Sequence, residues 1–418
     1  MREMKDSGIE WIGEIPVGWE LNKIGCVYDE RNVKVSDKDY APLSVTKQGI
    51  VPQLETAAKT DNGDNRKLIK KGDFVINSRS DRRGSCGISE YDGSCSLINT
   101  VLKPRKNMCS AYYSFVFRSE CFADEFYRWG TGIVDDLRST KWSNMKNIYI
   151  PFPPLKEQHR ISTYLDTTCE KIDSIIARQQ EVMEKLKAYR LSVITEAVTK
   201  GLNPDVRLKD SGVEFLGEVP ENWEVLKFGR CITIKSNLVP PENYYDYPQI
   251  APDNIEKNSA KLLDHKTVKD SGVISWNHLF FKGQILYSKI RPLLNKVIIA
   301  PFDGLCSADM YPIETENNSK FIVYVILADY FSAQVGLVTE NRVKMPKINQ
   351  NELSGIIVAM PKLEEQQQIT DYLDKKCSAI DSAIAKKQAI IKKLTAYKKS
   401  LIYEVVTGKR GVTMDSVQ

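Results

Sequence analysis

The sequence predicts an α+β chain in which two similar mixed α/β domains are separated by an antiparallel pair of long coiled-coil helices, with pseudo-two-fold symmetry. Two matched pairs of segments lead to this prediction. Residues 5–25 match 209–229 at 12 of 21 positions, and 155–199 match 363–407 at 23 of 45 positions without a gap. Repetition of this extent indicates a tandem duplication, in which each copy has a leading segment, a variable body and a long helical segment.

The repeat also sets the domain boundaries. We expect a first domain at 1–154, a helical segment at 155–201, a second domain at 202–361, a second helical segment at 362–408, and a flexible C-terminal tail at 409–418. Within the bodies, short runs rich in Val, Ile, Tyr and Phe alternate with Gly, Pro, Asn and Asp, which is typical of strands and turns. Each domain is then about 150 residues long, near the most common domain size.

Although the sequences of the two bodies have diverged, two short segments still match between them. Lys71-Gly72 resembles Lys282-Gly283, and residues 92–96 (DGSCS) resemble 303–307 (DGLCS), both at an offset of 211. An apolar run follows the Lys-Gly pair in each copy, which predicts a strand at the same place. We therefore expect one scaffold that carries two different surfaces.

The helical segments show apolar residues at steps of three and four, and neither segment contains proline. We expect the two stripes to pack against each other in antiparallel orientation, with Leu165 beside Leu401 and Ile172 beside Leu394. A parallel coil between two copies of the chain is the alternative. The predicted seam consists of Leu165, Ile172, Ile175, Val182, Leu186, Tyr189, Val193, Leu373, Ile380, Ile390, Leu394, Tyr397 and Leu401.

Composition narrows the function without fixing it. The 418 residues have a net charge of +5, which is compatible with a nucleic-acid partner. The nine cysteines include no Cys-x-x-Cys pair, and the three histidines are widely separated, so no metal site is expected. No signal peptide or membrane-spanning run is present, and we expect a soluble, cytoplasmic protein.

The leading segments (KDSG-x-E-[WF]-[IL]-GE-[IV]-P-x-x-W) and the helical segments (LxEQxxI…YLD…C…ID) resemble those of specificity subunits of type I restriction–modification enzymes, as does LSVTKQG at 43–49. The resemblance covers in effect the whole chain. It implies a non-catalytic subunit with two target recognition domains, each binding one half of a bipartite double-stranded DNA target. It also implies two methyltransferase subunits docked on the helical segments, with restriction and motor subunits in the full complex. No cofactor is then expected on this chain, whereas S-adenosylmethionine, ATP and Mg belong to the partner subunits.

Candidate DNA contacts are cations and amides near the ends of matching strands, because phosphates require cations and base edges require hydrogen-bonding side chains. In the first body they are Lys47, Gln48, Arg79, Arg82, Arg83, Arg138 and Lys141. In the second body they are Lys289, Arg291, Asn295, Lys296, Arg342, Lys344 and Lys347. Each single residue could instead be an ordinary solvated surface charge.

Catalytic alternatives find little support in the sequence. No Asn/Asp-Pro-Pro-Tyr/Phe motif of an adenine methyltransferase occurs, and Gly408-Lys409-Arg410 lacks the upstream glycine and the hydroxyl residue of a P-loop. Trp19 and Trp223 occupy matching positions in the leading segments, so we expect core packing rather than base stacking. A coiled-coil scaffold, or a DNA-binding adaptor acting outside a restriction complex, remains the alternative function.

Overall fold

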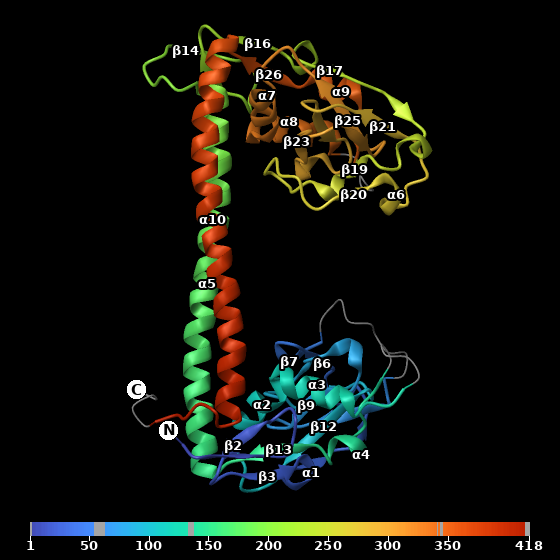
Figure 1. The fold of residues 1–418 in the computed structure, drawn as a ribbon, viewed down its shortest axis with the longest axis vertical. Coiled ribbons are helices and arrows are strands. Elements are labelled where there is room, and N and C mark those ends of the chain that lie inside the picture. The colour runs from blue at the N-terminus through green and yellow to red at the C-terminus, as the bar shows by residue number, and fades with distance from the viewer. Residues whose placement is uncertain (1, 54–62, 133–137, 341, 343–345, 414–418) are drawn as a thin grey trace. The chain divides into compact units, whose positions relative to one another are not determined.

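The computed structural model describes residues 2–53, 63–132, 138–340, 342 and 346–413. The chain forms two compact units (Figure 1), residues 1–179 with 389–418 and residues 180–388, and each is described by itself. Both long helices pass from one unit into the other: α5 spans Leu155–Lys200 and α10 spans Leu363–Val406. Each unit therefore contains half of α5, half of α10 and one mixed α/β body.

In the first unit, the leading segment folds as a hairpin and the body follows it. The strands are β1 (Met4–Asp6), β2 (Glu14–Pro16), β3 (Glu20–Lys23), β4 (Tyr28–Glu30), β5 (Lys34–Val35), β6 (Leu43–Thr46), β7 (Gly49–Pro52), β8 (Arg66–Ile69), β9 (Phe74–Asn77), β10 (Cys86–Ile88), β11 (Gly93–Cys95), β12 (Asn99–Pro104) and β13 (Tyr149–Phe152). The short helices are α1 (Ile24–Val27), α2 (Ser110–Arg118), α3 (Glu120–Arg128) and α4 (Trp142–Met145). One sheet has the order β10-β9-β12-β4 and another the order β11-β8-β5.

The second unit repeats this plan. Its strands are β14 (Leu208–Asp210), β15 (Glu218–Pro220), β16 (Glu224–Lys227), β17 (Thr233–Ile234), β18 (Leu238–Val239), β19 (Pro248–Ile250), β20 (Lys266–Thr267), β21 (Asn277–Phe280), β22 (Ile285–Ser288), β23 (Val297–Ile299), β24 (Gly304–Cys306), β25 (Met310–Glu314) and β26 (Ile357–Met360). The short helices are α6 (Val268–Ser271), α7 (Ser319–Leu327), α8 (Asp329–Thr339) and α9 (Gln350–Gly355). The four-stranded order β23-β22-β25-β17 repeats β10-β9-β12-β4 of the first unit. The five-stranded sheet has the order β18-β21-β24-β19-β20, in which β24-β21-β18 repeats β11-β8-β5 and β19 and β20 are additional, so the diverged bodies share the core of one topology.

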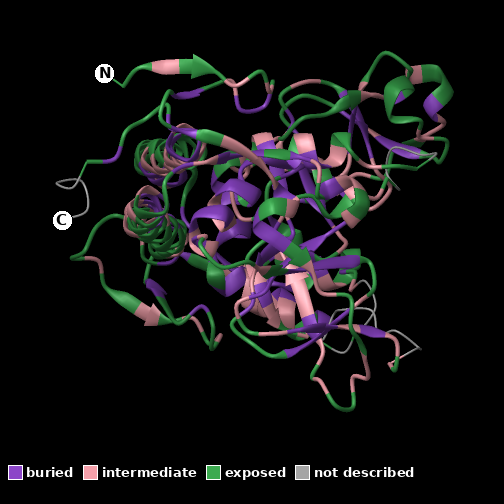
Figure 2. Ribbon diagram, turned by 90° about the horizontal axis from the view of Figure 1, so that it is seen from below, coloured by how far each residue is buried: buried purple, intermediate pink, exposed green. Residues whose placement is uncertain are grey.

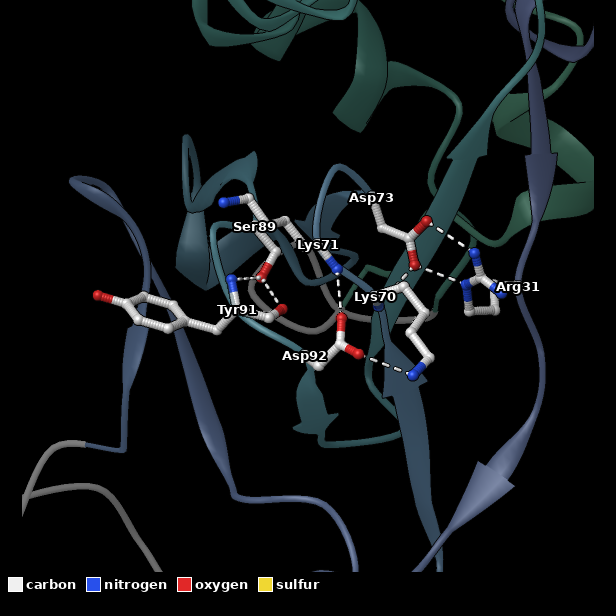
Figure 3. A network of polar contacts seen from close by, with 7 residues as sticks. All are labelled: Arg31, Lys70, Lys71, Asp73, Ser89, Tyr91 and Asp92. Carbon is white, nitrogen blue, oxygen red and sulfur yellow. Dashed lines mark hydrogen bonds and ion pairs between the residues drawn. The ribbon is translucent and has the colours of Figure 1, made fainter.

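The two matching segments, the Lys-Gly pair and the Asp-Gly segment, form the same turn in both bodies. The Lys71 backbone N–H donates to Asp92 Oδ1 at 2.8 Å, and the Lys282 N–H donates to Asp303 Oδ1 at 2.7 Å. Figure 3 shows the first of these turns, where Asp92 also accepts from Lys70 Nζ at 2.8 Å. A carboxylate thus fixes the approach to the central strand, β9 or β22, in each body.

The glycine after each of these aspartates is required by a close approach of two backbones. A Cβ at Gly93 would lie 2.6 Å from the Ala41 carbonyl oxygen, and one at Gly304 would lie 2.6 Å from the Pro248 carbonyl oxygen. Both distances are shorter than any real Cβ contact. The position therefore tolerates no side chain in either copy.

Each leading segment packs its tryptophan into the core, as the sequence predicts. Trp19 is 2% exposed and Trp223 is 1% exposed. Trp19 Nε1 donates to Glu157 at the start of α5, at 3.0 Å. In Figure 2 the buried segments gather inside the bodies, whereas long stretches of the helices are exposed. In the segment predicted to be a flexible tail, Val412 is buried in the core of the first unit, and residues 414–418 lie outside the described residues.

Within each unit the two half-helices run antiparallel. In the first unit Leu165, Ile172 and Leu401 are buried in one core, with Leu394 packed against it. In the second unit Val193 shares a core with Leu373, near the opposite ends of the same helices. The contacts agree with an antiparallel arrangement in both units.

The predicted seam is wrong for one row of residues. Ile175, Tyr189, Ile390 and Tyr397 are between 41% and 55% exposed. Val182, Leu186 and Leu394 are half-buried, and Leu373 and Ile380 are buried. The buried row lies one residue further along the helix and contains Cys169, Met183, Arg190 and Cys377.

Among the described residues, no single helix is long and apolar enough to cross a membrane. The bent pair α7–α8 passes the same test of length and composition when its two helices are taken together. However, residues 321–327 of α7 are all buried in the core of the second unit, as expected for core helices.

Candidate nucleic-acid interface

In the first body, two predicted clusters that are distant in sequence lie side by side. Residue 79 forms an isolated antiparallel bridge with Ser139. The Ser80 N–H donates to the Arg138 carbonyl at 3.0 Å, and the Thr140 N–H donates to the Ser78 carbonyl at 3.0 Å. The loop after β9 and the segment before α4 therefore make one surface.

The side chains on this first surface are mostly exposed cations. Arg79, Arg82, Arg138 and Lys141 are exposed. Arg83 is also exposed, but it forms an ion pair with Asp124 on α3. An exposed cation cluster on two hydrogen-bonded segments is suited to phosphate contacts.

The second body joins its two clusters in the same way. Ile290 forms an antiparallel bridge with Lys347, and the Arg291 N–H donates to the Pro346 carbonyl at 2.8 Å. The Ile348 N–H donates to the Lys289 carbonyl at 2.9 Å. The loop after β22 and the segment before α9 thus form the counterpart of the first surface.

Several cations of the second surface also have partners. Lys289 is half-buried, with its Nζ 5.5 Å from the ring centre of Tyr311. Lys347 Nζ lies 3.0 Å from Asp309 Oδ1. Arg291 is exposed and has a left-handed backbone with φ 45°. Lys344 lies outside the described residues.

Arg342 is exposed and paired with a carboxylate. Its Nη1 donates to Glu352 Oε2 at 3.1 Å. The hydrogen bond from Arg342 holds the pKa of Glu352 below its usual value, so this carboxylate stays ionised. Much of the Arg342 charge is therefore already neutralised.

The predicted DNA contact is wrong for Asn295, and Lys296 points inward as well. Asn295 is 2% exposed, and its Nδ2 donates to the Ile326 carbonyl at 2.9 Å. Lys296 Nζ donates to the Pro252 carbonyl at 2.7 Å. The Lys296 ammonium also lies 3.6 Å from the exposed Asp253 carboxylate. Both side chains thus donate to backbone carbonyls of the body, a role that the sequence around them does not reveal.

Lys47 and Gln48 are exposed in the turn between β6 and β7. Arg118 Nη2 donates to the Lys47 carbonyl at 3.2 Å, and these two residues line a groove of about 730 Å³ together with Arg83. The sequence gives no signal for Arg118, because a cation in the last turn of a helix is common for reasons of helix stability.

A buried histidine lies close to the second surface. His278 is 6% exposed on β21, and its Nδ1 has no hydrogen-bond partner in the described part of the chain. Burial lowers the pKa of His278 below 6.5, and the nearby Lys289 ammonium lowers it further. The imidazole is therefore neutral at physiological pH.

The sequence of the chain is similar to those of known specificity subunits. The sequence profile described as type I restriction modification DNA specificity domain matches residues 16–184 and 219–396. The specificity subunit of the Escherichia coli type I restriction enzyme EcoDI is 35% identical over 241 residues, 54% of each chain, so the match spans about half the length of that relative. The MjaVIII specificity subunit of Methanocaldococcus jannaschii is 26% identical over 428 residues, 94% of this chain and 93% of that one.

Solved structures show the same fold. A chain from a type I R-M system superimposes with a TM-score of 0.71 at 14% identity, covering 95% of this chain and 99% of that one. The HsdS subunit from Thermoanaerobacter tengcongensis gives a TM-score of 0.50 at 15% identity, covering 95% and 98%. Since two copies of the specificity domain match most of the chain, the protein belongs to the type I restriction–modification DNA specificity family.

Proposed function

We propose that each body reads one half of a bipartite double-stranded DNA target. The observation that supports this is the recurrence of one backbone frame with different side chains. Residue 79 pairs with Ser139 in the first body, and Ile290 pairs with Lys347 in the second. A shared frame positions both loops alike on the phosphates, while unlike side chains give each its own base preference.

The helical segments are proposed to carry two methyltransferase subunits. Their sequences match at 23 of 45 positions, so they offer two similar surfaces. Each helix has exposed apolar and aromatic side chains, Ile175 and Tyr189 on α5 and Ile390 and Tyr397 on α10. They support a protein partner, because interfaces are enriched in such residues. Restriction and motor subunits join the same complex in this proposal, which places the protein in the cytoplasm with DNA. S-adenosylmethionine, ATP and Mg are then bound by the partners.

The decisive experiment is a map of modified bases in cells that carry this subunit and its partners. We expect two short half-sites at a constant gap. Replacing residues 28–150 with the body of a relative should change one half-site and leave the other and the gap unchanged. Alteration of both half-sites, or of neither, would contradict the proposal and favour a scaffold or an adaptor outside a restriction complex.

A salt titration of the assembled complex on a target duplex provides a second test. If the two surfaces together contact about six to ten phosphates, affinity should fall by about 10³ to 10⁵ between about 50 and 200 mM salt. A scaffold that does not touch DNA would give no such slope.

A further inference from the structure

In the second unit, one helix side chain reaches into a loop of the body. Arg190 of α5 is 7% exposed. Its Nη1 donates to the Asn258 carbonyl at 3.2 Å and its Nη2 donates to the Ser259 carbonyl at 3.1 Å. Its Nε lies 3.4 Å from Oδ1 of Asp381 on α10, and Lys261 Nζ lies 3.1 Å from Oδ2 of the same carboxylate. We call these five residues the Arg190 clamp.

The clamped loop has an uncommon backbone. Asn258 has φ 55° and Ala260 has φ 59°. The left-handed region is unfavourable for alanine because of its Cβ, so surrounding contacts must hold the loop in this conformation. The hydrogen bonds from Arg190 to two successive carbonyls, those of Asn258 and Ser259, are contacts of this kind at the tip of the loop. A guanidinium has several donors in one rigid plane. Two nitrogens of Arg190 donate to the carbonyls, while its Nε faces the Asp381 carboxylate as an ion pair without a hydrogen bond among the described residues.

The loop also contacts the second DNA-binding surface. The Asn258 N–H donates to the Asn295 carbonyl at 3.3 Å. Asn295 closes the turn that starts at Arg291, because its own N–H donates to the Pro292 carbonyl at 2.9 Å. Hydrogen bonds therefore connect α5 to the Arg291 turn through a single intervening loop.

The first unit has the matching ion pair without the loop contact. Lys398 and Asp173 occupy the positions that correspond to Arg190 and Asp381 at the offset of 208. In the part of the chain that the structure describes, Lys398 Nζ donates to both Asp173 oxygens, at 2.7 and 2.6 Å, and to no carbonyl of the body. The clamp is thus a feature of the second unit, and Lys398 provides a matched control.

We propose that Arg190 is a positioning residue that fixes the Arg291 turn of the second body against the helices. This rests on the proposed function, in which that turn contacts DNA. With the clamp intact, the second half-site is read at one distance and rotation from the helical segments. With the clamp broken, the turn samples several placements, and discrimination at that half-site falls.

Hydrogen exchange on the full-length chain tests the contact without DNA. Arg190→Lys keeps a positive charge opposite Asp381 but cannot hold two carbonyls and the carboxylate together. It should raise amide exchange at Asn258 and across the Arg291 turn by about tenfold. Lys398→Arg should leave these amides unchanged. Unchanged exchange in Arg190→Lys would overturn the proposal.

The modified-base map tests the consequence in the assembled complex. Arg190→Lys should lower discrimination at the second half-site, or between neighbouring gap lengths, by about tenfold, with the first half-site unaffected. Equal loss at both half-sites, or no loss, would overturn the positioning role. A wild-type map without paired half-sites would instead refute the proposed function, and the exchange result would still decide whether Arg190 holds the loop.

Discussion

Lys398 on α10 reaches across to Asp173 on α5, with its Nζ 2.6 Å from Oδ2 of the carboxylate. The second unit repeats this cross-helix pair as Arg190 with Asp381, in a more buried setting. The Lys398 side chain is 28% exposed, whereas the Arg190 side chain is 8% exposed. Equivalent positions of the repeat therefore form an ion pair near the surface in the first unit and a buried ion pair in the second.

This difference predicts that equivalent substitutions at the two positions lower the free energy of unfolding by unequal amounts. Lys398→Met should change the free energy of unfolding by no more than about 1 kcal/mol, because exposed ion pairs contribute little. Arg190→Met should destabilise by about 2–4 kcal/mol, because it leaves two carbonyls without their donor and removes one partner of Asp381. Urea denaturation of both variants checks this. Equal destabilisation by the two substitutions would contradict the difference in burial between the two ion pairs.

A second prediction concerns the polar network of the first body (Figure 3). Asp73 is 2% exposed and accepts from Arg31 at 2.6 and 3.0 Å and from the Lys70 N–H at 2.9 Å. Asp73→Asn should destabilise the protein by about 2–4 kcal/mol, because it breaks a buried charge pair. Asp92→Asn, at the exposed end of the network, is the control and should have a much smaller effect in the same assay.

A third prediction separates the two surfaces that we propose contact DNA. Arg79→Ala should weaken binding through the first half-site, and Arg291→Ala through the second, by about 1–3 kcal/mol if the contact is to a base. If the contact is to phosphate, binding should weaken regardless of sequence, and the slope of log affinity against log salt concentration should become smaller by about 1. Titrations on duplexes mutated in one half-site at a time distinguish these results. Lys185→Ala, on the outer face of α5, should change neither.

A fourth prediction follows from the pKa of His278, which burial and Lys289 hold below 6.5. When the pH falls below 6.5, the unfolded chain takes up a proton that the folded chain does not, so stability is lost. The loss continues until the pH passes the lower pKa of the folded state. Melting temperatures at about pH 7.5 and about pH 5.5 should therefore differ less for His278→Asn than for the wild type. An unchanged difference would show that His278 is not responsible.

The fold could be predicted in outline because the repeat is strong. The leading hairpins, the long helices and the burial of Trp19 and Trp223 all follow from local patterns. The seam was harder to predict, since Ile175 and Ile176 both fit the steps of three and four from Ile172, and the buried row contains the charged residue Arg190. Only the structure reveals that Asp381 and two loop carbonyls partner this arginine, because all of them are distant in sequence.

The sequence could predict which cationic segments lie together, but not whether each side chain within them is exposed. Arg79 and Arg138 follow from cation density near strand ends, and their segments do meet. Asn295 resembles its neighbours in sequence, yet its amide faces the Ile326 carbonyl inside the body. Composition cannot tell an amide that faces solvent from one that completes a buried turn.

The close approach at Gly93 and Gly304 has a practical consequence for comparing members of this family. At both sites the need for glycine comes from the clearance between two backbone segments inside the body. The glycine can therefore serve as a fixed landmark for numbering loops in bodies whose sequences no longer align. Counting from it would allow contact positions found in one half of the molecule to be transferred to the other.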